Sequence, residues 1–398
     1  MMRPQPATWF EIITAINRQR EVLDSLATAG CAEMEPIAIY QAAGAEQPGS
    51  DAPNGSIFAR ITGWTSDAER LGHCLARSHA PAVVHFPSAP KELQPPLFLS
   101  NPAWIQPFEI FARLVGMPSR FTTDPSGLLV LVAPILFGYM FGDVIQGLAL
   151  IVIGLALQWR WPMLRLLVAG GYSAMVFGFV FGAAGGMHGA IAPLWLAPLD
   201  DPLPVLLVPI AFGGALLTLG LALKGLQAYW STRLANWLRS DAGLLVLYLG
   251  LLLALAHPAG WLLVAAGLCI QVAGGLWQER RVGAGFAAIG ELIEKLVQIS
   301  INTVSFVRVG AFALAHAGLS SALVALVKDM DSGAAYVLLL IAGNALIIVI
   351  EVLVASIQTT RLVLFEFFTR FFETSGREFH PLPAPAGLAE ETRNVQRT

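Results

Sequence analysis

From Gly127 onward, long apolar runs alternate with short segments that carry charged residues. An apolar run of about 20 residues is long enough to cross the hydrocarbon core of a bilayer as a helix. The first two runs form one apolar stretch that only Asp143 interrupts. We therefore predict a mainly α polytopic protein with about eight transmembrane helices, near residues 127–142, 144–158, 163–184, 203–223, 242–256, 258–277, 291–327 and 334–373.

The last two predicted helices are longer than a bilayer requires. At about 1.5 Å per residue they measure roughly 55–60 Å, nearly twice the hydrocarbon thickness. A helix of that length either projects into water or tilts steeply. We expect tilted helices, because helices that lie obliquely beside a curved partner would have a reason for such length.

Residues 1–120 have a different pattern, with mixed charge and shorter apolar stretches. The periodicity predicts a small α/β domain with a helix over Glu11–Ala29, a strand over Ser56–Gly63, a helix over Thr65–Arg77 and a strand over Pro81–Phe86. Glycine, proline and small polar residues predict a loop over 42–56. We expect this domain to be cytoplasmic, a membrane domain to cover 121–380, and 381–398 to be a disordered cytoplasmic tail.

The composition identifies an integral membrane protein. Of the 398 residues, 56% are hydrophobic and 13% are charged, whereas soluble domains carry about 25% charged residues. The net charge of −3 gives no sign of nucleic-acid binding. Cys31, Cys74 and Cys269 show neither disulfide nor metal-site spacing, so we expect them to be reduced.

Charge is distributed unevenly between the connecting segments. If the amino terminus is cytoplasmic, the segments on the other side contain Lys328 beside several aspartates. This asymmetry is the positive-inside pattern, and it predicts that both termini are cytoplasmic. The cytoplasmic segments then hold Arg160, Arg165, Lys224, Arg233, Arg239, Arg280, Arg281, Arg370 and Arg377.

The seventh predicted helix carries a polar stripe. At about 100° per residue, its polar side chains fall within an arc of about 120°. A polar stripe that faced lipid would be penalised along its whole length, so we expect it to face protein or water. The stripe consists of Glu291, Glu294, Gln298, Asn302, Ser305, Arg308, His316 and Ser320.

The eighth predicted helix brings a second set of polar residues. Glu351 and Gln358 share one face, and Arg361 lies about 60° from Gln358. Antiparallel pairing with the seventh helix would give two offset polar half-paths, separated by Arg308 and Arg361. Carboxylates and imidazoles relay protons, whereas a guanidinium stays protonated and blocks direct passage. Because no moving carboxylate is evident in this chain, ions would have to travel on another subunit.

Plainer interpretations remain open for single residues. An intramembrane arginine can pair with a glutamate or with backbone carbonyls, and His316 can be a packing residue. Asp143 either caps a break between the first two helices or lies on an ion path. For the whole chain, the alternatives are a stand-alone secondary transporter that binds an anionic substrate through Arg308 and Arg361, and a degenerate stator homologue that assembles without pumping.

Several segments resemble the membrane stator subunit of V/A-type rotary ATPases, called subunit a or subunit I. The most specific are SFVRVGAFALAHAGLSSAL and EVLVASIQTTRLVLFEFFTRFF, and PILFGYMFGDVIQG resembles the first helix pair of that family. The resemblance implies that Arg308 faces the carboxylates of a rotating c-ring and that Arg361 is the second arginine. It also implies an inner half-channel at Glu294 and an outer one at Glu351 and His316.

The resemblance further implies the partners and location of the chain. We expect the c-ring, peripheral stalk subunits and other V/A-ATPase subunits as partners, in a prokaryotic inner membrane. We expect no nucleic acid, no metal, no cofactor and no catalysis by the chain alone. Family members usually carry a much longer cytoplasmic arm, so we expect the stalk contact to be reduced or rearranged. The residues Ile145 and Gln146 depart from the family pattern after Asp143.

Overall fold

The structure is a computed structural model that describes residues 3–35, 58–78, 81–90, 92–185, 187–188, 191–279, 282–328 and 333–383, with the backbone alone for 187–188, 278–279, 282–288, 328 and 333–335. Within these residues, five helices are long and apolar enough to cross a bilayer. There are six if the bent pair Leu234–Ser240 and Ala242–Ala254 counts as one span. The prediction of a mainly α polytopic membrane protein is confirmed.

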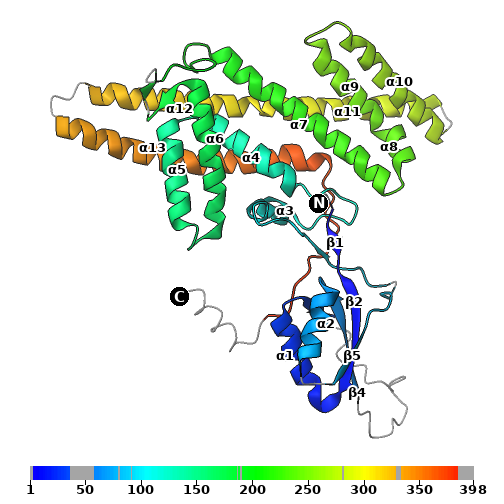
Figure 1. Cartoon of the computed structure of the whole chain (residues 1–398). Coiled ribbons are helices and arrows are strands. Elements are labelled where there is room, and N and C mark those ends of the chain that lie inside the picture. Colours follow the sequence, from blue (N-terminus) through cyan, green and yellow to red (C-terminus); the bar gives the residue numbers. More distant parts are fainter. Residues whose placement is uncertain are drawn as a thin grey trace.

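The N-terminal part is a four-stranded antiparallel sheet in the order β3-β4-β2-β5, with two helices on one face (Figure 1). Apolar side chains of both helices and of the strands form a common core, which includes Phe10, Ile12, Val22, Leu26 and Leu71. The elements are β2 (Thr8–Ala15), α1 (Gln19–Ala29), β3 (Ala32–Met34), β4 (Phe58–Thr65), α2 (Ala68–Arg77) and β5 (Ala82–His85), followed by a short pairing of β1 (Gln5–Pro6) with β6 (Leu97–Phe98).

The helix predicted over Glu11–Ala29 was wrong in its first part, because β2 occupies that segment. Ile12 is fully buried and pairs with Ile61 of β4 and Val84 of β5, so neighbouring strands determine the local structure. The helix predicted over 65–77 and the two predicted strands are present within a few residues of their expected bounds. The predicted loop at 42–56 and residues 384–398 of the predicted tail lie outside the described residues.

A helix lies at each of the eight predicted membrane segments. α4 and α5 are short for a span, with 15 and 14 residues. The helices are α3 (Glu109–Val115), α4 (Ser126–Met140), α5 (Val144–Leu157), α6 (Arg165–Phe181), α7 (Pro202–Trp230), α8 (Leu234–Ser240), α9 (Ala242–Ala254), α10 (Gly260–Glu279), α11 (Val282–Ser305), α12 (Val307–Lys328) and α13 (Gly333–Arg361).

Three predicted spans differ in detail from the structure. The third ends at Phe181, before a hairpin of β7 (Ala183–Ala184) and β8 (Met187–His188). The seventh is two helices, α11 and α12, that meet at Phe306. The eighth continues from α13 as a π-helical segment over Leu362–Phe367 and a 3-10 turn over Phe368–Arg370.

Glycines let two helical hairpins pack at backbone distance. A Cβ atom on Gly147 of α5 would lie 2.8 Å from the backbone nitrogen of Met175 in α6. A Cβ atom on Gly267 of α10 would lie 2.5 Å from the backbone nitrogen of Leu247 in α9. Any larger residue at these positions would push the helices apart.

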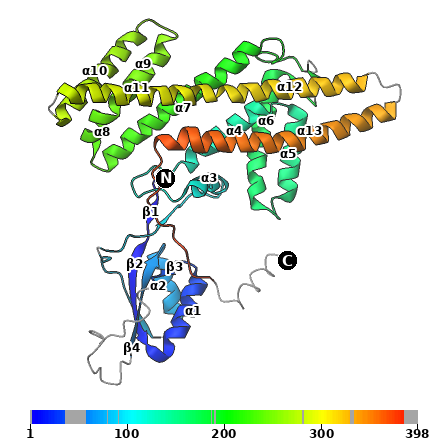
Figure 2. The same cartoon turned by 180° about the vertical axis from the view of Figure 1, so that it is seen from behind.

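The α11–α12 helix and α13 lie side by side and cross the α5–α6 hairpin steeply (Figures 1 and 2). This crossing agrees with the tilt predicted for the two long helices. Phe306, between α11 and α12, packs against α7. The buried ring of Phe306 covers Gly213 of α7, where an added Cβ atom would lie 2.3 Å from the ring.

After the last helix, the chain returns to the N-terminal sheet. The backbone nitrogen of Leu97 donates to the carbonyl oxygen of Arg377 at 2.7 Å. The Arg377 guanidinium donates to the carboxylates of Glu33 and Glu35, the latter at 3.1 Å. The first and last described segments therefore lie on the same side of the helical part.

Candidate functional site between the long helices

Two polar contacts join α12 to α13 and fix their antiparallel register. A guanidinium nitrogen of Arg308 donates to the side-chain oxygen of Gln358 at 3.3 Å. About two turns further along α12, Nδ1 of His316 contacts a carboxylate oxygen of Glu351. The residues that the sequence placed on two facing stripes are thus brought together in pairs.

The His316–Glu351 pair is enclosed at the end of this row nearest the α12–α13 connection. His316 is 4% exposed, and its ring packs against Phe141 with 5.3 Å between ring centroids. A cavity of about 350 Å³, lined mainly by apolar side chains such as Phe312 and Leu319, borders the pair. Nε2 of His316 is buried without a hydrogen-bond partner in the described chain. An imidazole paired with one carboxylate in apolar surroundings can hold a proton and release it.

Polar contacts continue from this pair toward the β7–β8 hairpin. The Gln146 side chain donates to the side-chain oxygen of Asn344 at 2.9 Å, and Asn344 lies seven residues before Glu351 on α13. The predicted site did not include either residue. The recurrence of Asn344, Glu351 and Gln358 every seven positions is the signal that could have identified the first of them.

Asp143 has a clear structural role beside these residues. It is fully buried and caps the N-terminus of α5, since its carboxylate accepts from the backbone nitrogens of Gln146 and Gly185, each at 2.9 Å. These bonds tie α5 to the hairpin that follows α6. They match one of the two roles considered for Asp143 from the sequence, that of a helix cap.

The arginines lie around a buried glutamate on the π-helical segment. Glu366 is 6% exposed, accepts a hydrogen bond from Ser305, and is attracted by Arg308, Arg361 and Arg370. Arg361 itself is exposed on the surface of the chain, whereas Arg308 is half-buried. π-helical segments often occur at functional sites, and here the segment begins directly after Arg361.

Arg370 extends the row toward the opposite end. With the Asn302 amide in the orientation that satisfies both of its groups, its oxygen accepts from Arg370 and its nitrogen donates to the Gln298 carbonyl oxygen at 3.3 Å. Next to it, the Tyr248 and Thr303 hydroxyls lie 2.6 Å apart. In the sequence, Arg370 stood out only as one of the positive charges that predict which ends of the helices are cytoplasmic.

A chain of alternating charges lies at the far end of the row. Lys224 pairs with Asp241 at 2.9 Å, Asp241 with Lys295 at 3.1 Å, and Lys295 with Glu291 at 2.8 Å. Since these residues come from three separate parts of the chain, no local spacing revealed the connection. Glu294 is exposed beside this chain of charges.

Two stripe residues remain, Gln298 on α11 and Ser320 on α12. Gln298 is exposed, and its backbone carbonyl accepts from Asn302. Ser320 is fully buried, and its hydroxyl has no partner among the described residues. The predicted stripe therefore runs from the exposed end of α11 to the buried part of α12.

Fold and site define a polytopic membrane protein with a row of ionisable and amide side chains between two long antiparallel helices. No family model matches the chain. Curated relatives include the A-type ATP synthase subunit I of Pyrococcus horikoshii, 26% identical over 74% of this chain and 48% of the relative. That of Methanocaldococcus jannaschii is 26% identical over 88% of this chain and 59% of the relative.

A bacterial relative, the V-type ATP synthase subunit I 2 of Treponema pallidum, is 31% identical over 25% of this chain and 24% of its own length. The chain spans about half the length of the first curated relatives that it matches. It belongs to the subunit a/subunit I family of the V/A-type rotary ATPases.

Proposed function

We propose that this chain is the stator subunit of a V/A-type rotary ATPase or ATP synthase that carries ions across the membrane. The observation that carries the proposal is the row between α12 and α13, in which an arginine group separates two differently built ends. The names of the relatives support membership of such a complex.

The geometry suits two half-channels on either side of a barrier. His316 and Glu351 serve the outer half-channel, while Glu291, Glu294 and neighbouring polar residues serve the inner one. Arg308 and Arg361 hold fixed positive charge between them, since a guanidinium does not release its proton. A proton or Na⁺ therefore leaves the row at the arginines and continues on a carboxylate of the rotor.

The exposed apolar surface of α13 favours a partner that packs against this helix. In the most apolar part of the span from Tyr336 to Arg370, 6% of the residues are buried within the chain. The corresponding share for the span from Pro202 to Trp230 is 44%. Arg361 is exposed on the same helix. An arginine on an apolar membrane surface needs an opposite charge or water nearby, and a rotor carboxylate would supply that charge by pairing with it.

The full proposal includes the setting of the chain. The partners are the c-ring, the peripheral stalk and other subunits of the ATPase, within a prokaryotic inner membrane and with both termini cytoplasmic. The N-terminal sheet is the part that contacts the stalk. Catalysis of ATP hydrolysis or synthesis belongs to other subunits, and this chain couples it to ion transfer.

The test is ATP-driven ion pumping by the assembled complex in vesicles. Arg308→Ala should abolish pumping, because the barrier between the half-channels loses its fixed charge. Arg239→Ala is a matched control, since Arg239 lies on the short helix α8 and stacks over Trp277, 5.7 Å from the ring centroid. The control should pump like the wild type.

Retained pumping in assembled Arg308→Ala complexes contradicts the proposed mechanism. Co-purification separates the proposal from a secondary transporter. A rotor ring that purifies with the chain supports the stator, whereas uptake of an anionic substrate by the chain alone supports the transporter.

A further inference from the structure

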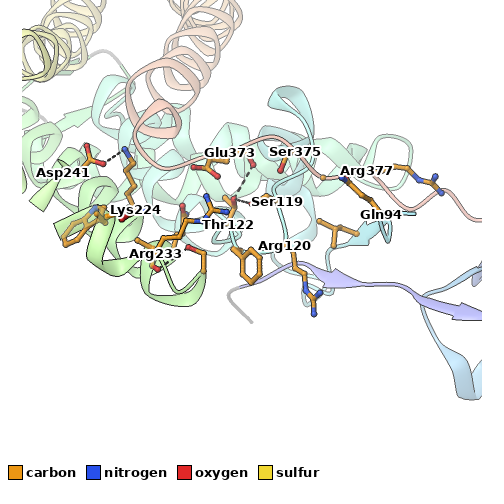
Figure 3. Close-up of a pocket in the computed structure, with 18 of the residues that line it drawn as sticks. Gln94, Ser119, Arg120, Thr122, Lys224, Arg233, Asp241, Glu373, Ser375 and Arg377 are labelled. Carbon is orange, nitrogen blue, oxygen red and sulfur yellow. Dashed lines mark hydrogen bonds and ion pairs between the residues drawn. The ribbon is translucent and has the colours of Figure 1, made fainter. Parts of the chain in front are cut away.

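A second polar site lies where the helical part meets the N-terminal part. It is a pocket of about 570 Å³ between the end of α7, the helix α8, the loop at 119–122 and the segment at 373–377 (Figure 3). Lys224 and Arg233 come from one wall, and Ser119 and Thr122 from another. This pocket lies apart from the His316–Glu351 pair and from the arginines of the row.

The pocket has positive charge that the chain does not neutralise. Of its four basic side chains, Lys224 is paired with Asp241 and Arg377 with Glu33 and Glu35. The other two, Arg120 and Arg233, are exposed and make no hydrogen bond or ion pair with any residue that the structure describes.

Besides Asp241, the lining contains one further carboxylate, that of Glu373, so the two guanidinium groups outnumber it. Ser119 and Thr122 add hydroxyl groups, which lie 2.6 Å from each other; the Thr122 hydroxyl also donates to the backbone carbonyl of Glu373 at 3.4 Å, a weak bond that a ligand oxygen can replace. Guanidinium groups beside hydroxyl donors are typical of sites that bind the oxygens of a phosphate.

The elements around the pocket have the composition of a membrane–water interface. Trp237 lines the pocket, and Tyr229 and Trp277 are exposed on the adjoining helices. α8 is bent by 50° from α9, so it does not continue the direction of that span. Tryptophan and tyrosine collect at the level of lipid headgroups, and basic pockets at the cytoplasmic side bind anionic headgroups.

The backbone turn that presents Arg233 is strained. Thr232 has a φ of 58°, a left-handed conformation that a β-branched residue rarely adopts. The turn connects the end of α7 to α8 and brings Arg233 to the wall of the pocket. Such strain persists where the surrounding structure fixes it, often at ligand-binding sites.

We propose that this pocket binds the phosphate group of an anionic phospholipid, with Arg120 and Arg233 as the charged ligands. The lipid would seat its headgroup between α8 and the loop at 119–122 and leave its acyl chains in the bilayer beside the exposed apolar surface. This inference goes beyond the ion-transfer proposal and does not depend on it, because its charged ligands, Arg120 and Arg233, are not residues of the row; the pocket borders the row only at Lys224 and Asp241, which pair with each other.

The test uses the full chain in detergent and native mass spectrometry with added phosphatidylglycerol or phosphatidylcholine. The wild type should bind phosphatidylglycerol about tenfold more tightly, because each basic residue near the headgroup adds attraction. The double variant Arg120→Gln/Arg233→Gln should lose this preference. Circular dichroism should show that the variant keeps its helical content.

Arg239→Gln is the matched control, because Arg239 is also an exposed arginine of α8 but does not line the pocket. It should keep the preference. An equal loss in Arg239→Gln, or no preference in the wild type, overturns the proposal. Inorganic phosphate is the second arm: if it binds through Arg120 and Arg233 while phosphatidylglycerol shows no preference, a soluble phosphate replaces the lipid as the ligand.

Discussion

The two ends of the polar row between the long helices are built in opposite ways. At one end, His316 and Glu351 form a single pair inside an apolar cavity. At the other end, charges from α7, from the junction of α8 with α9, and from α11 form a chain in which Asp241 contacts two lysines. The first end depends on one contact, whereas the second has more than one way to balance each charge.

This difference follows from access to water. A buried group that loses its only partner cannot be solvated, so removing one member of a buried pair is costly. Glu291 is more than half exposed, and water can replace its lysine. We therefore expect substitutions at the His316–Glu351 end to have large effects and those at the exposed end to have small ones.

The largest expected effect is at Glu351. Glu351→Gln should lower ATP-driven pumping by about a hundredfold, because an amide cannot take up and release the proton that a carboxylate of the proposed outer half-channel would pass on. Glu291→Gln should lower it only several-fold, because Glu291 is more than half exposed to water and Glu294 of the same proposed inner half-channel stays in place. The measurement is pumping by assembled complexes in vesicles, and equal effects at the two sites would break the comparison.

The second expected effect is on stability at Asp241. Lys224→Met/Lys295→Met should destabilise the chain by about 3 kcal/mol, because a buried carboxylate is left without a cation. Lys295→Met alone should cost less than about 1 kcal/mol, because Lys224 still pairs with Asp241. Denaturation in detergent measures both. If the single variant loses as much as the double one, the two lysines do not substitute for each other.

The smallest expected change in stability is at Glu294, which is exposed. Glu294→Gln should leave the unfolding free energy within about 0.5 kcal/mol of the wild type. If Glu294 belongs to the inner half-channel, the same variant should pump several-fold more slowly. Unchanged pumping would remove this residue from the proposed path, and a large loss of stability would show that it has an unrecognised structural partner.

Much of the polar row could be predicted from the sequence. Ionisable residues are costly in a membrane helix, so Arg308, His316 and Glu351 are conspicuous among apolar neighbours. Helical periodicity then places them on faces that can meet. The partner of Arg370 and the contact between Gln146 and Asn344 could not be predicted in this way, because each joins helices far apart in the chain.

The N-terminal part and the helix break show the same limit. The segment at 11–15 has a helical pattern when it is taken alone, but pairing with β4 and β5 makes it a strand. The interruption at Phe306 could not be predicted either, because nothing in the apolar pattern over 291–327 marks it; its ring packs against Gly213 of α7. Local propensity yields to tertiary contacts when those contacts bury the backbone or a large side chain.

The order of residues along the chain is enough to identify a membrane protein, to locate its apolar helices and to show which intramembrane residues carry charge. These properties depend on hydrophobicity and helical period, which are local. Which charges neutralise one another, and which have no partner among the described residues, as at Arg120 and Arg233, became known from the packing of the helices alone. Pairing depends on distances of a few ångströms between separate helices, and no spacing along the chain fixes those distances.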